Sequence, residues 1–319
     1  MQHRFPILLL ALLAVPLINS QVDSRARYKV DVNMVALTFS VTDKTGNHVT
    51  GLKPADIRIF EDGIPQKLAA FAEGSTLFRL LDDAPDSSGT GVFLLFDTSN
   101  RMYTSYPYVR DAIAEFIRRL APVDSAAIYT FSRNLFRAAV LTRDHVRAGA
   151  GLDNISAGDD SALFNALLLT LRDAAQVPGR KAIVVFSNSS DNASMLSPYD
   201  VGRVAVNEGI PIYVISTRDA AQDPVMLDAL QYLTVTTGGK LYCARNWQKQ
   251  AGAFQSIRED IRNSYTAYYY PAPNPNQGFR NIQIEVVTPG GKAWHVLARP
   301  GYEPRKDLST GQESGGEPL

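Results

Sequence analysis

The sequence predicts an α/β protein with a doubly wound, mostly parallel sheet and a small all-β part beside it. In the middle of the chain, continuous apolar runs typical of strands buried on both faces alternate with amphipathic helical patterns. Before and after this region apolar and polar residues alternate, as in strands with one buried face. The polar stretch 82–90, which is rich in Asp and Ser, separates the first β region from the middle.

The central region, 91–263, carries the α/β pattern. Its first predicted strand, 91–96, ends at Asp97, and Val109 and Ile113 then mark the apolar face of a helix. The pattern continues with strands at 126–131, 182–186, 210–215 and 241–244 and with helices at 162–175, 199–207, 225–233 and 247–262. Strands that alternate with helices imply right-handed crossovers and a parallel sheet.

Two β segments, 28–72 and 264–303, flank the central region. The first contains an alternating strand pattern over 28–43 and a hairpin pattern over 57–71. A β unit of about forty-five residues buries too little apolar surface to be stable alone. We therefore expect the two segments to pair as one β-sandwich interrupted by the α/β domain. The sequence further predicts a linker at 73–90 and a disordered tail at 304–319.

The N-terminus has the layout of a secretory signal peptide. His3 and Arg4 precede an apolar run at 7–18, and polar residues follow from Asn19. We expect residues 1–20 to be the signal peptide and the mature protein to be exported, either to the periplasm or to the extracellular space. The apolar run is shorter than the roughly 20 residues that span a bilayer, so no transmembrane segment is expected after cleavage.

The overall charge excludes one class of partner. Lys and Arg together number 32, as do Asp and Glu, so the formal net charge is zero and nucleic acid is not expected as a partner. Cys243 is the single cysteine, so no internal disulfide can form, and its apolar neighbours predict a buried side chain.

Three polar clusters follow or face the carboxyl ends of predicted strands, where ligands bind in doubly wound sheets. The first, 97–102, comes directly after the strand 91–96. The second, 158–163, opens the helix 162–175, and the third, 187–192, follows the strand 182–186.

In this order the clusters resemble the von Willebrand factor type A (VWA) family, whose metal-ion-dependent adhesion site uses Asp-x-Ser-x-Ser, a later Thr and a later Asp. The resemblance covers 91–263 and matches Asp97, Ser99 and Ser161 to the first Asp, the first Ser and the Thr. Two positions depart from the family pattern. Arg101 stands where the second Ser belongs, and Asn188 stands where the last Asp belongs.

The flanking segments carry a wider resemblance. The stretches 41–46, 49–52, 59–66 and 298–302 are similar to those of the exported VWFA-related proteins of Acidobacteria. This similarity spans nearly the whole mature chain and implies an exported protein of poorly defined role.

The altered ligand set favours a degenerate site with no cofactor. Asp97 is the one aligned carboxylate, and the guanidinium of Arg101 can pair with it, whereas Mg²⁺ prefers oxygen ligands that include carboxylates. The alternative is a site for Mg²⁺ or Mn²⁺ completed by carboxylates from the same clusters, namely Asp159, Asp160 or Asp191.

The sequence favours a binding protein over an enzyme. It contains no Gly-x-Ser-x-Gly or phosphate-loop pattern and no histidine at a predicted strand end beside a serine. We expect a metal-independent scaffold or interaction module with an unidentified protein partner. The alternatives are a metal-dependent adhesive protein that binds an acidic group and, more remotely, a hydrolase. The tyrosines at 265 and 268–270 are expected in a sandwich core and not on a binding surface.

Overall fold

The computed structural model describes residues 34–74, 76–79, 89–100, 102, 106–188, 191–217, 223–287 and 294–304. These residues all belong to one unit of the chain, Asn33–Leu319. The predicted signal peptide at 1–20, the start of the first predicted strand and Arg101 lie outside the described residues. So does all of the predicted tail except Pro304.

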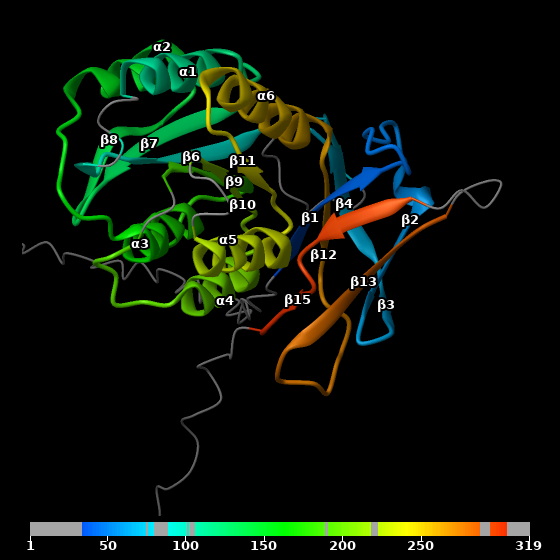
Figure 1. Cartoon of the computed structure of the whole chain (residues 1–319). Helices are drawn as coiled ribbons and strands as arrows, with labels where there is room; N and C mark the ends of the chain where they lie inside the picture. The colour runs from blue at the N-terminus through cyan, green and yellow to red at the C-terminus, as the bar shows by residue number, and fades with distance from the viewer. Residues whose placement is uncertain are drawn as a thin grey trace, which may run out of the picture. The chain divides into compact units, whose positions relative to one another are not determined.

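The middle of the chain forms a six-stranded sheet in the order β11-β10-β9-β6-β7-β8 (Figure 1). All neighbouring strands are parallel except β8, which runs antiparallel to β7 at one edge. The strands are β6 (Thr90–Asp97), β7 (Ser125–Phe131), β8 (Leu135–Thr142), β9 (Arg180–Ser187), β10 (Ile212–Ser216) and β11 (Leu241–Cys243). Every residue of the central strand β6 is buried, as its continuous apolar run predicts.

Helices cover both faces of this sheet. They are α1 (Tyr106–Arg118), α2 (His145–Ala150), α3 (Leu163–Ala175), α4 (Pro198–Glu208), α5 (Pro224–Thr237) and α6 (Trp247–Asn263). Alternate residues of β6 point to opposite faces: Leu94 packs in a core with α1, α2 and α6, and Leu95 packs in a second core with α3, α4 and α5. The predicted fold class, a doubly wound and mostly parallel α/β sheet, is thereby confirmed.

Three elements differ from the sequence prediction. β8 and α2 were not predicted. β8 is an edge strand whose residues are mostly half-exposed, so its sequence pattern is neither alternating nor continuously apolar. β5 (Thr76–Arg79) lies within 73–90, which was expected to be a linker, and pairs with β4 (Leu68–Glu73). A four-residue strand beside a stretch rich in Asp and Ser gives too little pattern to detect.

The two ends of the described chain contribute strands to the same sheets. One sheet has the order β14-β1-β12-β4-β5 and the other β15-β13-β2-β3. The remaining strands are β1 (Val35–Thr42), β2 (Ile57–Glu61), β3 (Ile64–Gln66), β12 (Tyr265–Tyr269), β13 (Arg280–Val286), β14 (His295–Ala298) and β15 (Gly301–Tyr302). β1 pairs antiparallel with both β12 and β14, and β2 pairs antiparallel with β13.

An aromatic core with a buried carboxylate lies within the β part. Tyr265 and Tyr269 are fully buried there, as expected from the sequence, whereas Tyr268 is buried in a separate, smaller core and Tyr270 is only half-buried. The hydroxyl groups of Tyr269 and Tyr302 donate to Oε1 of the buried Glu61, at 2.8 and 2.7 Å. These bonds connect β12 of one sheet to β2 and β15 of the other, because Glu61 belongs to β2.

Two buried arginines connect the β part to the α/β part. Arg180, at the start of β9, donates to the Gly74 carbonyl, to the Ile261 carbonyl at 3.0 Å and to Ser264 Oγ at 2.6 Å. Arg299 donates to the Val206 carbonyl at the end of α4, at 2.6 Å, and to the Ala36 carbonyl in β1, at 3.3 Å. Burial lowers the pKa of both guanidinium groups. Both are held mainly by neutral carbonyl oxygens.

Two further sequence expectations concern exposure and membranes. Cys243 is exposed, contrary to the prediction, because it ends a three-residue strand at the edge of the sheet. Across the parts of the chain that the structure describes, no helix is both long enough and apolar enough to cross a membrane.

The arginine at the start of β9 offers a test of how the two parts are held together. The substitution Arg180→Met keeps much of the apolar stem but leaves the Gly74 and Ile261 carbonyls without their donor. We expect the free energy of unfolding to fall by about 2–4 kcal/mol. Urea denaturation measures the change. Arg172→Met on the exposed side of α3 is the control and should change stability by less than about 0.5 kcal/mol.

Candidate functional site

Three loops meet at the carboxyl edge of the α/β sheet, where β6 and β9 end. Ser99, just after β6, forms a β-bridge with Gly158, and the Gly158 N–H donates to the Thr98 carbonyl at 2.9 Å. The Ser161 N–H donates to Asn192 Oδ1 at 2.8 Å, and the Asn192 N–H donates back to the Ser161 carbonyl at 2.9 Å. The loops after β6, before α3 and after β9 are therefore joined by hydrogen bonds.

Asp97 lies at the centre of this edge and is fully buried. Its Oδ1 accepts the Ser99 N–H at 2.9 Å, and its Oδ2 accepts the Ser187 hydroxyl at 2.6 Å. The Asn188 N–H also donates to this carboxylate. Burial raises the pKa of Asp97, while the hydrogen bonds from Ser187, Ser99 and Asn188 oppose the rise.

The hydroxyl of Ser99 is the unusual group of the site. Ser99 is only 2% exposed, and its side chain lowers the pKa of the neighbouring Asp97, but among the described residues its Oγ has no partner in good hydrogen-bond geometry. A buried hydroxyl without a partner costs free energy, since it has left water without replacing its hydrogen bonds. Ser161 and Asn188 are buried at the same edge. The structure thus places Asp97, Ser99, Ser161 and Asn188 together, while Arg101 is not described.

Two of the three nearby carboxylates that could complete a metal site make other contacts. Asp160 forms an ion pair with Arg133, which lowers the pKa of Asp160. Asp191 accepts the Phe164 N–H at the start of α3, at 3.0 Å, and the Ser194 N–H at 2.9 Å. Asp159 is exposed.

The residues present do not fit a divalent cation well. Asp97 is the single carboxylate among the four grouped residues, and its oxygens already accept several donors. Within the described ranges no three His, Cys, Asp or Glu side chains are placed to hold a metal ion. Mg²⁺ and Mn²⁺ favour octahedral oxygen sites that include carboxylates. The arrangement instead supplies neutral hydroxyl and amide groups around one buried carboxylate.

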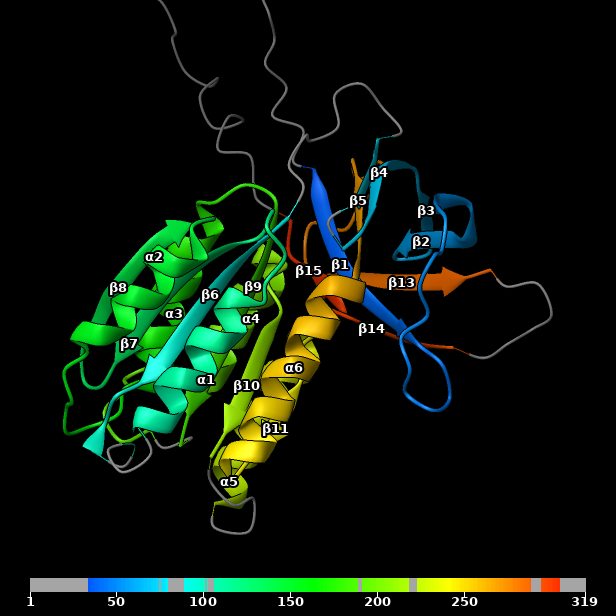
Figure 2. The same cartoon turned by 90° about the horizontal axis from the view of Figure 1, so that it is seen from above.

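Large apolar side chains are exposed on the segments around this site. In a parallel α/β sheet, the helix that follows a strand begins at the carboxyl edge of the sheet. Figure 2 shows this arrangement, with the end of β6 and the start of α6 on the same side of the domain. Met195, in the loop after β9, is 95% exposed, and Trp247, the first residue of α6, is 63% exposed. Others lie in the first turns of α1, α4 and α5 and at the start of β8: Tyr108, Tyr199, Val225 and Phe136.

Sequence reasoning missed these apolar residues. The sequence does contain a signal for them, because Tyr108, Tyr199 and Trp247 sit at or near predicted helix starts, away from the apolar stripes that face the sheet. We name the six side chains the carboxyl-edge patch: Tyr108, Phe136, Met195, Tyr199, Val225 and Trp247.

Comparison with known proteins finds solved structures but no sequence family. No protein-family model matches the chain, and no curated protein matches it. The conserved hypothetical protein BatB from Bacteroides thetaiotaomicron is similar at 18% identity and a TM-score of 0.46, over 54% of this chain and 97% of that one. A von Willebrand factor type A structure from Catenulispora acidiphila is similar at 11% identity and a TM-score of 0.46, over 74% of each chain.

A third solved structure is the vWF domain of the type V pili tip protein Mfa5 from Porphyromonas gingivalis. It is 11% identical, with a TM-score of 0.47, over 56% of this chain and 96% of that one. At these identities and TM-scores, likeness alone establishes neither a family nor an activity for this chain.

Two serines that flank Asp97 should respond oppositely to the same substitution. Ser99→Ala removes a buried hydroxyl that has no partner among the described residues, so the free energy of unfolding should stay the same or rise by up to about 1 kcal/mol. Ser187→Ala removes a hydrogen bond to a buried carboxylate and should lower it by about 1.5–3 kcal/mol.

Urea denaturation in the presence of a chelator measures both changes, and each variant serves as the control for the other. A loss on Ser99→Ala as large as that on Ser187→Ala would mean that the Ser99 hydroxyl has a stabilising partner.

Proposed function

We propose that this chain is a non-catalytic protein-binding module that contacts its partner through the carboxyl edge of its α/β sheet. The observation that carries the proposal is the carboxyl-edge patch. Exposed Trp, Tyr, Phe and Met side chains are enriched at protein interfaces, where they supply most of the buried apolar area. Here they lie on segments near the edge of the sheet at which the hydrogen-bonded loops meet.

The polar centre of this edge supports binding and not catalysis. A serine nucleophile needs a nearby base to accept its proton. The three described histidines lie elsewhere: His48 contacts Asp260 of α6, His145 begins α2, and His295 begins β14. None of them can serve Ser99 or Ser161 from these positions.

We further propose that the α/β part is a degenerate VWA domain, at 91–263, that binds without a metal ion. The single grouped carboxylate, Asp97, and the substitution of Arg101 and Asn188 for family ligands support this. The pairing of β1 with β12 supports the companion proposal that this domain is inserted between two segments of one β part, 28–72 and 264–303.

The signal-peptide layout of residues 1–20 supports export. In this proposal the partner is a protein of the periplasm, the envelope or the surrounding medium. Because Cys243 is the single cysteine of the sequence, no internal disulfide takes part in the interaction.

One observation favours a second candidate, a metal-dependent adhesive site that grips an acidic group of the partner. The buried Ser99 hydroxyl beside Asp97 is a ready oxygen donor for a cation. In this alternative Asp159, which is exposed, would have to join Asp97 to provide a second carboxylate.

Calorimetric titration with Mg²⁺ and Mn²⁺ distinguishes the two candidates. For the unmodified protein we expect no binding in the micromolar range, because one carboxylate and one guanidinium give the aligned site no net negative charge. The double substitution Arg101→Ser with Asn188→Asp restores the family ligand set and should create or strengthen binding. Micromolar Mg²⁺ binding by the unmodified protein, abolished by Asp97→Ala, would contradict the metal-free proposal and favour the adhesive one.

A further inference from the structure

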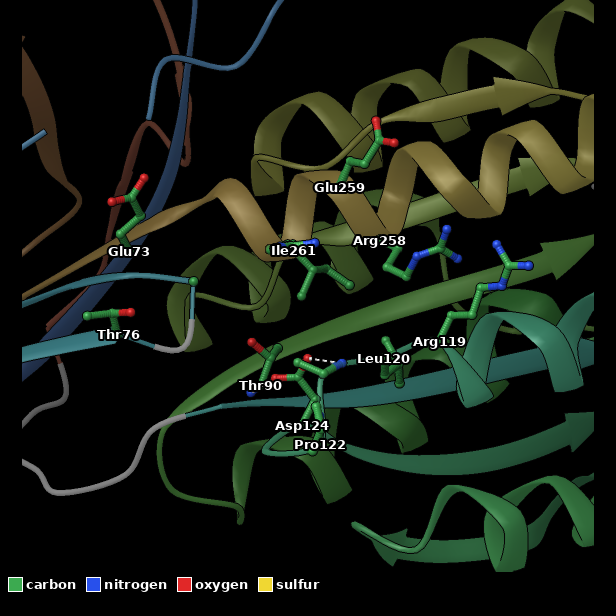
Figure 3. A pocket seen from close by; sticks show the side chains of 13 residues that line it. Glu73, Thr76, Thr90, Arg119, Leu120, Pro122, Asp124, Arg258, Glu259 and Ile261 are labelled. Atoms are coloured by element: carbon green, nitrogen blue, oxygen red, sulfur yellow. Dashed lines mark hydrogen bonds between the residues drawn. The ribbon is translucent and has the colours of Figure 1, made fainter. Parts of the chain in front are cut away.

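A cavity of about 600 Å³ lies at the opposite, amino edge of the α/β sheet (Figure 3). Its walls come from the turn between β4 and β5, the start of β6, the loop between α1 and β7, and the last turns of α6. The cavity therefore lies where the α/β part meets the β part. Ligand pockets of roughly 300–1,000 Å³ occur preferentially at such joins.

The arginines of the cavity are incompletely neutralised. Arg258 forms no ion pair or hydrogen bond with any residue that the structure describes, although it is only partly exposed. Arg119 pairs with Glu115, but Arg118 pairs with the same carboxylate, so one negative charge serves two guanidinium groups. Figure 3 shows the side chains of Arg119 and Arg258 extending in the same direction, with Glu259 pointing away from them.

The acidic residues of the wall make other contacts. Glu73 accepts the Gly51 N–H at 2.8 Å, on the far side of the β4–β5 turn. Asp124 accepts the Thr90 N–H at 2.7 Å and the Ala121 N–H at 3.2 Å, which fixes the loop before β7. Glu259 accepts the side-chain amide of Gln255 at 2.9 Å. None of these contacts is an ion pair with Arg258, although the charge of Glu259 partly offsets the lowering of the Arg258 pKa.

Arg262 also lines the cavity, and a further arginine, Arg180, adds positive charge behind the wall. Arg180 donates to the carbonyl groups of Gly74 and Ile261, and both of these residues line the cavity. It is fully buried, and its hydrogen bonds go to neutral oxygen atoms.

The positive charges of Arg119 and Arg258 repel each other. Burial, together with the nearby positive charge of Arg119, lowers the pKa of Arg258. Two guanidinium groups held close together cost free energy, and an anion between them would remove that cost. Arginine binds carboxylate and phosphate oxygens in bidentate geometry, through short and strong hydrogen bonds.

We propose that this cavity binds a small multivalent oxyanion, a polycarboxylate or a phosphate, between Arg119 and Arg258. This site is separate from the carboxyl-edge patch and does not depend on the proposed function. Because Arg119 and Arg258 come from distant segments that meet only in the folded chain, a bound anion would stabilise the folded state.

Calorimetry and thermal denaturation of the full chain test the site, with citrate and inorganic phosphate as the two probes at constant ionic strength. Glucose is the uncharged control. We expect saturable binding of at least one probe and a rise in melting temperature with its concentration. The stronger of the two probes identifies the oxyanion as a carboxylate or a phosphate.

Arg258→Gln and Arg119→Gln should each weaken binding about tenfold or more, since each removes a charged pair of hydrogen bonds. Arg172→Gln, at the end of α3, is the matched control for an exposed arginine near a helix end and should bind like the parent.

Without ligand, Arg258→Gln should melt at or above the parent temperature, because it relieves the repulsion between Arg258 and Arg119. Arg119 is exposed, so Arg119→Gln keeps the test valid if Arg258→Gln does not fold. Absence of saturable binding up to about 10 mM of either probe, or equal binding by the Arg119→Gln variant and the parent, would overturn the proposal.

Discussion

The antiparallel pairing of β1 with β12 is the constraint on which the rest of the structure depends. It joins Val35–Phe39 to Tyr265–Tyr269, segments that are far apart in sequence, in one hydrogen-bonded ladder. β12 follows α6 after the single residue Ser264, so the pairing also fixes where the last helix of the α/β part ends. Arg180 strengthens this junction, because it donates to both Ser264 and the last turn of α6.

This arrangement gives the two edges of the α/β sheet different environments. The amino edge meets the β part, where buried arginines donate to backbone carbonyls of both parts and a cavity remains between them. The carboxyl edge carries the Asp97 loops and the carboxyl-edge patch. Binding of a partner at the carboxyl edge therefore leaves the junction intact. An anion at the amino edge would act on stability and leave the partner surface unchanged.

The features that the sequence could predict are those with strong local patterns. The apolar run 91–96 predicted the central strand, and the polar residues after it predicted where Asp97 and Ser99 lie. β8 and β5 escaped prediction because their residues are only partly buried or because they are too short. The carboxyl-edge patch and the closeness of Arg119 to Arg258 depend on how distant segments of the chain come together in the fold. The periodicity of the sequence does not predict such tertiary contacts. The exposure of Cys243 depends likewise on its place in an edge strand.

The central claim, that a protein partner binds the carboxyl edge without a metal ion, is tested most directly by site-specific photo-crosslinking in the cells that naturally produce the chain and in their medium. A benzophenone residue replaces either Val225, in the first turn of α5, or Val235, near the end of the same helix; both side chains are exposed. The account predicts a discrete cross-linked protein from position 225, unchanged by chelator, and none from position 235. Equal cross-linking from both positions, or cross-linking from position 225 that requires Mg²⁺, would contradict it.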